Sequence, residues 1–102
     1  MSQRKTKKTS SIPSSGNVFA DLGFSPDEAE HLKLRAQLMG AVRQVIEQRQ
    51  LTQAQAAKLL GVTQPRISNL IQGKIELFSM DTLVSMLAQA GVHVGLTIEA
   101  AA

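Results

Sequence analysis

Residues 51–74 read LTQAQAAKLLGVTQPRISNLIQGK, and this stretch decides the fold. Thr52 followed by Gln55 has the spacing of a capping box, which predicts the start of a helix. Gly61 can adopt the positive φ of a left-handed cap, so we expect that helix to end there. Thr63 is a second N-cap residue, which predicts that another helix begins directly after it. The stretch therefore predicts two short helices joined by a turn of about three residues.

Small and apolar residues of the same stretch suit the contact between these two helices. Ala57 is small enough for a close crossing, and the wedge between the helices can be filled by Leu60, Val62, Ile67 and Leu70. Two short capped helices with a tight turn and a shared core describe a helix-turn-helix, in which the second helix lies in the major groove of DNA. The alternative is a helical hairpin with an ordinary solvated outer face.

The second helix, expected from Gln64 to about Ile71, carries residue types that read base edges. Gln and Asn can each form two hydrogen bonds with adenine, Arg can bind guanine with two, and the ring of Pro can touch the methyl group of thymine. The outward residues of this helix are Gln64, Pro65, Arg66, Ser68 and Asn69.

The residues before this motif predict a long helix. Ser25 is an N-cap residue, Pro26 is suited to the first helical position, and Glu28 stands where a capping box needs its carboxylate. Apolar residues then recur at helical spacing to about Gln48. Residues 17–24 are apolar at alternate positions and are expected to pack onto the domain.

The residues after the motif predict a helix and then a strand. Ser79 or a neighbour opens a helix over Met80–Ala90, and Gly91 ends it. Val92–Ile98 reads VHVGLTI and alternates with period two, which predicts a β-strand. Since a lone strand leaves its backbone groups unpaired, we expect pairing with the same strand of a second copy; a frayed, solvated tail is the alternative. The fold class expected is all-α: a helix-turn-helix domain of four to five helices, which resembles the lambda-repressor-like fold, with one C-terminal β-strand.

Positive charge is concentrated at the N-terminus. The whole chain carries a net charge of +3, and residues 1–16 contain Arg4, Lys5, Lys7 and Lys8 without any acidic residue. This polar stretch lacks the apolar surface that ordering requires, so we expect a disordered basic tail over 1–16 and a single DNA-binding domain, with its dimerisation strand, over 17–102. Such an arm suits contact with phosphates. A solubilising tail or a remnant of cloning is the alternative.

Composition disfavours several other classes of protein. The chain has no cysteine, and His31 and His93 lie far apart without a ligand spacing, so we expect no metal site and no cofactor. No apolar run approaches the length of a membrane span and the N-terminus is no signal peptide, so we expect a cytoplasmic protein without a membrane partner. No catalytic set of nucleophile, base or paired acids is apparent, which disfavours an enzyme. The lack of exposed aromatic platforms disfavours RNA binding.

Residues 51–74 resemble the Xre/Cro-type helix-turn-helix of phage repressors. Over residues 17–98 the chain is similar to the antitoxin-like (HigA-type) branch of that family, through FADLGF at 19–24, the long first helix, FSMD at 78–81 before the last helix, and the terminal strand. The resemblance implies base reading at Gln64 and Pro65. Some repressors have a polar residue at the position of Pro65, and the hydrogen bond made by that residue is lost here. It implies base or phosphate contacts at Arg66 and Asn69, contacts with the DNA backbone at Thr52, Gln53 and Lys74, and a weaker contact of that kind at Gln72. The candidate DNA-binding residues together are Thr52, Gln53, Thr63, Gln64, Pro65, Arg66, Ser68, Asn69, Gln72 and Lys74.

Two functions fit these observations. The first is a sequence-specific transcriptional repressor that is also the antitoxin of a toxin–antitoxin pair, binds a small ribonuclease toxin and regulates its own operon. The second is a stand-alone Xre-type regulator without a toxin partner. Both bind double-stranded DNA as a homodimer. An adjacent gene for a small basic protein would favour the antitoxin function. The long helix from Pro26 to about Gln48 and the basic tail are surfaces that a toxin could occupy.

Overall fold

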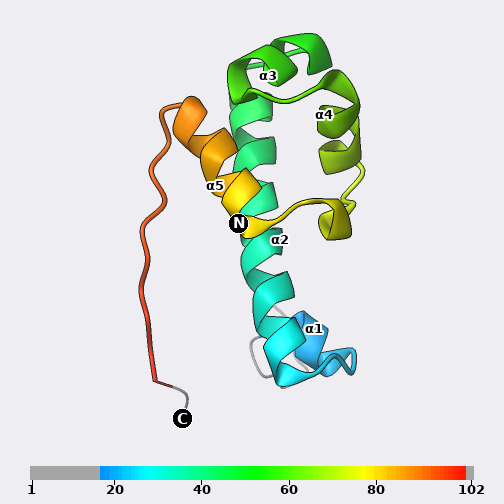
Figure 1. Ribbon diagram of the computed structural model, residues 1–102, viewed down its shortest axis with the longest axis vertical. Coiled ribbons are helices and arrows are strands. Elements are labelled where there is room, and N and C mark those ends of the chain that lie inside the picture. The colour runs from blue at the N-terminus through cyan, green and yellow to red at the C-terminus, as the bar shows by residue number, and fades with distance from the viewer. Residues whose placement is uncertain (1–16, 101–102) are drawn as a thin grey trace, which may run out of the picture. The chain divides into compact units, whose positions relative to one another are not determined.

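The computed structural model describes residues 17–100, which form five α-helices and one 3-10 helix (Figure 1). The chain divides into two compact units, and the division falls between Lys33 and Leu34, inside the second helix. The elements are α1 (Val18–Asp21), α2 (Pro26–Gln48), α3 (Gln53–Leu60), α4 (Gln64–Ile71), η1 (Ile75–Leu77) and α5 (Met80–Gln89). The predicted basic tail, with Arg4, Lys5, Lys7 and Lys8, lies outside the described residues.

In the N-terminal unit, one buried asparagine organises the start of the chain. The side-chain oxygen of Asn17 accepts hydrogen bonds from the backbone N–H groups of Phe19 at 3.0 Å and Ala20 at 3.4 Å, and so caps α1. Its side-chain nitrogen donates to the carbonyl oxygen of Ala29 at 2.9 Å, which ties α1 to the first turns of α2. The rings of Phe19 and Phe24 meet edge to face, with centroids 6.1 Å apart. The sequence did not predict α1, since four residues are too few for helical periodicity to show.

The N-cap predicted at Ser25 is confirmed. Its hydroxyl oxygen accepts a hydrogen bond from the backbone N–H of Glu28 at 3.2 Å, and its O–H donates to the carboxylate of Glu28 at 3.0 Å. Asp27 and Glu28 lie in the first turn of α2, where negative charge complements the positive end of the helix dipole. The predicted bounds of this long helix are also confirmed, because α2 ends at Gln48.

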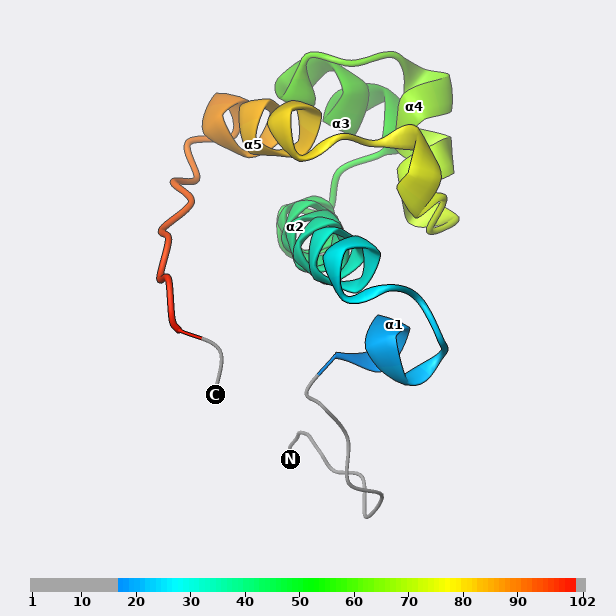
Figure 2. The same ribbon diagram turned by 60° about the horizontal axis from the view of Figure 1, so that its bottom comes forward.

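In the C-terminal unit, α3 lies between α4 and α5, and all three contribute to one core with the second half of α2 (Figures 1 and 2). The large side chains at its centre are less than 2% exposed, and each contributes about 1.5–3 kcal/mol by leaving water. They are Val42, Leu60, Ile67, Leu70, Phe78, Leu83, Met86 and Leu87. Of the residues predicted to fill the wedge between α3 and α4, Leu60, Ile67 and Leu70 are fully buried and Val62 is half-buried.

The predicted caps of the shorter helices are confirmed. Thr52 and Gln55 form a complete capping box, with the Gln55 N–H 3.1 Å from the Thr52 hydroxyl and the Thr52 N–H 2.8 Å from the Gln55 side-chain oxygen. Thr63 caps α4 and Ser79 caps α5 in the same manner, each through its hydroxyl oxygen. Gly61 ends α3 with φ of 72°, in the left-handed region.

The predicted C-terminal strand is wrong: within residues 17–100 the structure contains helices and no strand. The N–H of Val92 still bonds to the carbonyl oxygen of Leu87 at 2.9 Å, but the segment then leaves the core as an irregular chain. Val94, Leu96 and Ile98 are 43%, 80% and 87% exposed, so these side chains do not pack into the core. The period-two pattern is real, but a ladder also needs the edge of a second strand, and the described chain offers none.

Residues 17–100 include no helix that is both long enough and apolar enough to cross a membrane.

The backbone at Gly61 gives a first testable prediction. Gly61→Ala places a Cβ where φ is 72°, so we expect the free energy of unfolding in urea to fall by about 1–2 kcal/mol. The new Cβ would also lie 2.5 Å from the side-chain nitrogen of Gln89, but that side-chain end can move aside. We therefore expect the loss to change by only a few tenths of a kcal/mol in a Gln89→Ala background.

Two glycines serve as controls for that measurement. Gly73 has φ of 78° and open space around its Cβ position, so Gly73→Ala should lose about as much stability as Gly61→Ala. Gly40 lies inside α2 with ordinary φ and open space, so Gly40→Ala should gain about 1 kcal/mol through helix propensity. A Gly61→Ala variant as stable as the unsubstituted protein would contradict the role given to this turn.

Candidate nucleic-acid interface

Helix α4 is held to the core by one face and presents its first turn outward. Ile67 and Leu70 are fully buried, which fixes the rotation of the helix about its axis. Gln64, Pro65 and Arg66 at its start are exposed. Ser68 and Asn69 are half-buried at the edges of the buried face. The three residues of the first turn are therefore the most accessible of the predicted base readers.

The first turn of α4 has its backbone hydrogen bonds accounted for by a cap and a proline. The hydroxyl oxygen of Thr63 accepts the N–H of Arg66 at 3.3 Å. Pro65 stands in the first turn, where a missing N–H breaks no hydrogen bond within the helix. Gln64 is the exposed first residue of the helix, directly after this cap, and recognition helices contact base edges from such N-terminal positions.

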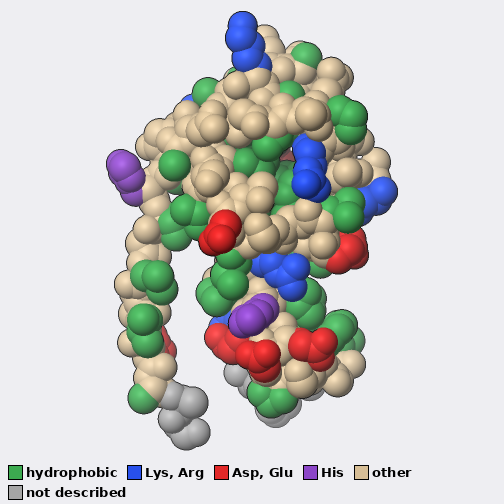
Figure 3. Space-filling view, in the orientation of Figure 1, with side chains coloured by type: hydrophobic (Ala, Val, Ile, Leu, Met, Phe, Trp, Pro, Cys, Tyr) green, Lys and Arg blue, Asp and Glu red, His purple; other side chains and the backbone are tan. Residues whose placement is uncertain are grey.

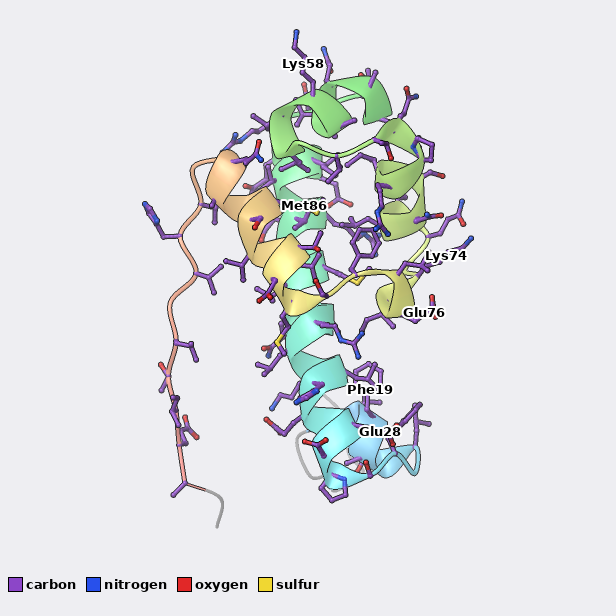
Figure 4. The ribbon with its side chains drawn as sticks, in the orientation of Figure 1. Phe19, Glu28, Lys58, Lys74, Glu76 and Met86 are labelled. Atoms are coloured by element: carbon purple, nitrogen blue, oxygen red, sulfur yellow. The ribbon has the colours of Figure 1, made fainter. Side chains whose placement is uncertain are left out.

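The end of α4 places the remaining candidates of that helix. The side-chain nitrogen of Gln72 donates to the hydroxyl of Ser68 at 3.2 Å, so these two side chains are joined on one face. Gly73 turns the chain, and the N–H of Lys74 bonds to the carbonyl oxygen of Asn69 at 3.1 Å. The side chain of Lys74 projects away from the protein at this point (Figure 4).

The start of α3 holds the two other candidates. Thr52 uses both its hydroxyl and its N–H in the capping box, and Gln53 is the exposed first residue of the helix. Lys58, in the last turn of α3, also projects outward (Figure 4), and sequence reasoning did not single it out. A lysine in the last turn of a helix interacts favourably with the negative end of the helix dipole, so the position of Lys58 has a structural explanation that does not involve DNA.

Arg66 differs from the other candidates because its side chain is already engaged. Its Nη1 donates to the carbonyl oxygen of Leu77 at 2.8 Å, and its guanidinium carbon lies 5.3 Å from the centre of the Phe78 ring. The partners lie eleven and twelve residues further along, beyond a loop, and no local pattern in the sequence signals such a contact. The structure thus places Arg66 with the predicted readers on α4, but with its charged group against the protein.

Five of the six cations of the C-terminal unit fall into two groups, and the sixth, Arg43, is exposed on α2. Arg35 and Arg49, like Arg66, donate to backbone carbonyl oxygens: Arg35 to Ile75 at 3.4 Å and Arg49 to Ala90 at 2.9 Å. Lys58 and Lys74 instead extend from the surface (Figure 4). In the space-filling view, basic side chains lie over α3 and α4 of the C-terminal unit (Figure 3). The acidic side chains of residues 17–33 cluster on the N-terminal unit (Figure 3). The C-terminal unit therefore offers flexible lysines to an anionic partner.

This arrangement agrees with the comparisons with known proteins. A family model for a helix-turn-helix domain matches residues 18–99. The chain belongs to the helix-turn-helix family. A solved structure described as an XRE family transcriptional regulator is 34% identical in sequence, with a TM-score of 0.67. The match covers 72% of this chain and 83% of that one, which supports the Xre type of helix-turn-helix. A comparison with curated proteins returned no match.

Proposed function

We propose that this helix-turn-helix protein is a transcriptional regulator that binds double-stranded DNA sequence-specifically and acts as a repressor. The observation that carries the proposal is the first turn of α4, which is capped, exposed and rotated outward by the burial of Ile67 and Leu70. A helix held in this way can enter the major groove with its N-terminal residues toward the bases. The similarity to a regulator of the XRE family supports the same function.

We assign roles to the candidate residues by their positions. Gln64 and Pro65 contact bases from the first turn, and Ser68 and Asn69 do so from the next turn of α4. Thr63 caps that helix and so fixes its first turn. Its position directly before the first turn also allows Thr63 to contact DNA. Thr52 and Gln53 at the start of α3, and Lys74 with Gln72 at the end of α4, contact phosphates and set the register on the duplex.

We also propose that the protein acts as a homodimer. Regulators of this kind read two half-sites that are related by the two-fold axis of the dimer. Three apolar side chains that are close together in sequence are exposed to solvent: Val94, Leu96 and Ile98. A second copy that covered them would remove this apolar surface from water. The long helix α2, which exposes 39% of Leu34, is the alternative surface for a second copy.

A second function, that of an antitoxin, has one structural observation in its favour. Residues 17–33 carry four carboxylates against the single cation Lys33, and the same segment exposes 60% of Val18 and 70% of Leu22. An apolar surface bordered by acidic groups suits a basic protein partner. This supports the resemblance to antitoxins, whose partner is a small ribonuclease toxin. Without such a partner, the protein is a stand-alone regulator.

DNA binding is tested by exchanging one base-reading and one phosphate-contacting side chain. We expect Gln64→Ala to cost about 1–3 kcal/mol at the cognate site and little on unrelated sequences, because the side chain is proposed to contact a base. Lys74→Ala should weaken both equally and reduce the slope of log K against log salt by about 1, because one phosphate contact is lost. Titrations at several salt concentrations measure both effects. An equal loss on all sequences for Gln64→Ala would rule out base reading at this position.

The dimer is tested by sedimentation of the full chain at low micromolar concentration. We expect a dimer, and we expect the double substitution Leu96→Asp and Ile98→Asp to shift it toward monomer, because two charges would be buried in an apolar contact. Circular dichroism should show unchanged helix content, since neither side chain belongs to the core. If the double variant remains dimeric, a matched Leu34→Asp variant locates the contact on α2 instead. If the unsubstituted chain is a monomer, the homodimer is wrong.

The antitoxin function is tested by affinity purification of the full chain from its source cell. We expect a small basic protein to co-purify, and the two purified proteins to bind each other without DNA. Leu22→Asp should weaken that binding while leaving operator binding unchanged, because Leu22 is proposed to touch only the protein partner. A chain that purifies with operator DNA and without a protein partner is the stand-alone regulator.

A further inference from the structure

One side chain connects the first turn of α4 to the segment that follows the helix. Arg66 donates from Nη1 to the carbonyl oxygen of Leu77 at 2.8 Å. Its guanidinium lies over the ring of Phe78, with the central carbon 5.3 Å from the ring centroid. A cation in this position is attracted by the face of the ring. Two separate contacts therefore restrain the charged group of Arg66 in the absence of DNA.

The residues that Arg66 contacts are themselves fixed. Phe78 is 1% exposed and belongs to the core, so the ring beneath the guanidinium has little freedom to move. Ile75–Leu77 forms the 3-10 helix η1, and the carbonyl oxygen of Ile75 also accepts from Nη1 of Arg35 at 3.4 Å. Two arginines on two helices, α2 and α4, thus hold one short turn by its carbonyl groups.

We propose that Arg66 is a positioning residue that holds α4 and the turn at 75–77 together, and that it does not read a base. The proposal rests on DNA binding by α4, and refines it. To reach the edge of a guanine, the guanidinium would first have to give up the Leu77 carbonyl and the Phe78 ring. A carbonyl that loses a charged donor carries a penalty in addition to the lost contact. Gln64 and Pro65, the other exposed residues of the first turn, make no such side-chain hydrogen bond within residues 17–100.

The held turn bears directly on the proposed phosphate contact at Lys74. Lys74 is the residue before η1, and its carbonyl oxygen accepts the N–H of Leu77 at 3.1 Å. Its own N–H bonds to the carbonyl oxygen of Asn69 in α4 at 3.1 Å. The backbone from which the Lys74 side chain extends is therefore fixed between α4 and the turn (Figure 4). Arg66 forms a second connection between α4 and this turn, through the carbonyl oxygen of Leu77.

Hydrogen exchange of the free protein tests the positioning role without any DNA. In Arg66→Gln, we expect the amides of Leu77 and Phe78 to exchange about tenfold faster, because η1 loses its side-chain contact with α4. Gln64→Ala, a neighbouring change on the same turn, is the matched control and should leave these amides unchanged. Unchanged exchange in Arg66→Gln would overturn the proposal.

DNA titration provides the second readout, as the ratio of cognate to unrelated affinity. We expect Arg66→Gln to lower both affinities by the same factor and to preserve the ratio. A fall of the ratio by about 5-fold to 150-fold, the equivalent of a lost base contact of about 1–3 kcal/mol, would make Arg66 a reader and overturn the proposal. If Gln64→Ala leaves the ratio unchanged, base reading at Gln64 fails instead, while the exchange result still decides the contact of Arg66 with the turn.

Arg66→Lys keeps the measurement possible if the glutamine variant does not fold. Lysine retains the charge and one donor but lacks the planar fork that can bond the carbonyl and cover the ring together. We expect intermediate exchange at Leu77 and Phe78 and an unchanged affinity ratio. A lysine variant with normal exchange and a reduced ratio would show that the guanidinium acts on a base, and would overturn the proposal.

Discussion

The left-handed backbone at Gly61 is the constraint on which the C-terminal unit depends. With φ at 72°, the chain leaves α3 and reaches the cap of α4 within two residues. That short path allows Leu60 on one helix and Ile67 and Leu70 on the next to share a single core. Burial of those side chains then rotates α4 so that its first turn faces outward. The proposed readout of DNA is therefore a consequence of one tight turn and the apolar contact that it makes possible.

Arginine and lysine have different tasks in this small domain. Backbone carbonyl groups at helix ends and in short turns need donors, because the regular hydrogen bonds of the helix stop there. Arg35, Arg49 and Arg66 supply these donors at Ile75, Ala90 and Leu77. The guanidinium suits this task because it offers several donors in a fixed plane and can cover a ring at the same time. Lysines 58 and 74 extend outward, and their mobile charge suits phosphates better than carbonyls.

Charge is also divided along the chain. Residues 1–16 carry four cations and no acid, residues 17–33 carry four carboxylates and one cation, and the remaining residues have a small positive excess. An acidic segment is repelled by DNA, so it has little use as part of a DNA-binding surface. It has more use as a surface for a protein, particularly as it exposes Val18 and Leu22. This division is the reason that protein binding by residues 17–33 can be tested separately from DNA binding by α4.

The sequence by itself determined the features that depend on near neighbours. Capping by Thr52, Thr63 and Ser79, the helix end at Gly61 and the bounds of α2 each depend on residues within a few positions, so local chemistry was sufficient to predict them. The candidate residues of α4 followed from the same pattern, and of these Gln64 and Pro65 are exposed as a reader requires.

Only the tertiary structure decided the features that depend on distant partners. Asn17 caps α1 and also reaches Ala29, Arg66 lies on Phe78 beyond a loop, and Gln89 approaches Gly61 from another helix. The predicted strand at Val92–Ile98 failed for the same reason, since alternation sets which side chains share a face but cannot supply the neighbouring edge. A helix forms its backbone hydrogen bonds within its own segment, so the local pattern of residues predicted α2, α3, α4 and α5 although packing stabilises them. A strand, or a charged group that needs a carbonyl elsewhere, depends on what folding brings beside it.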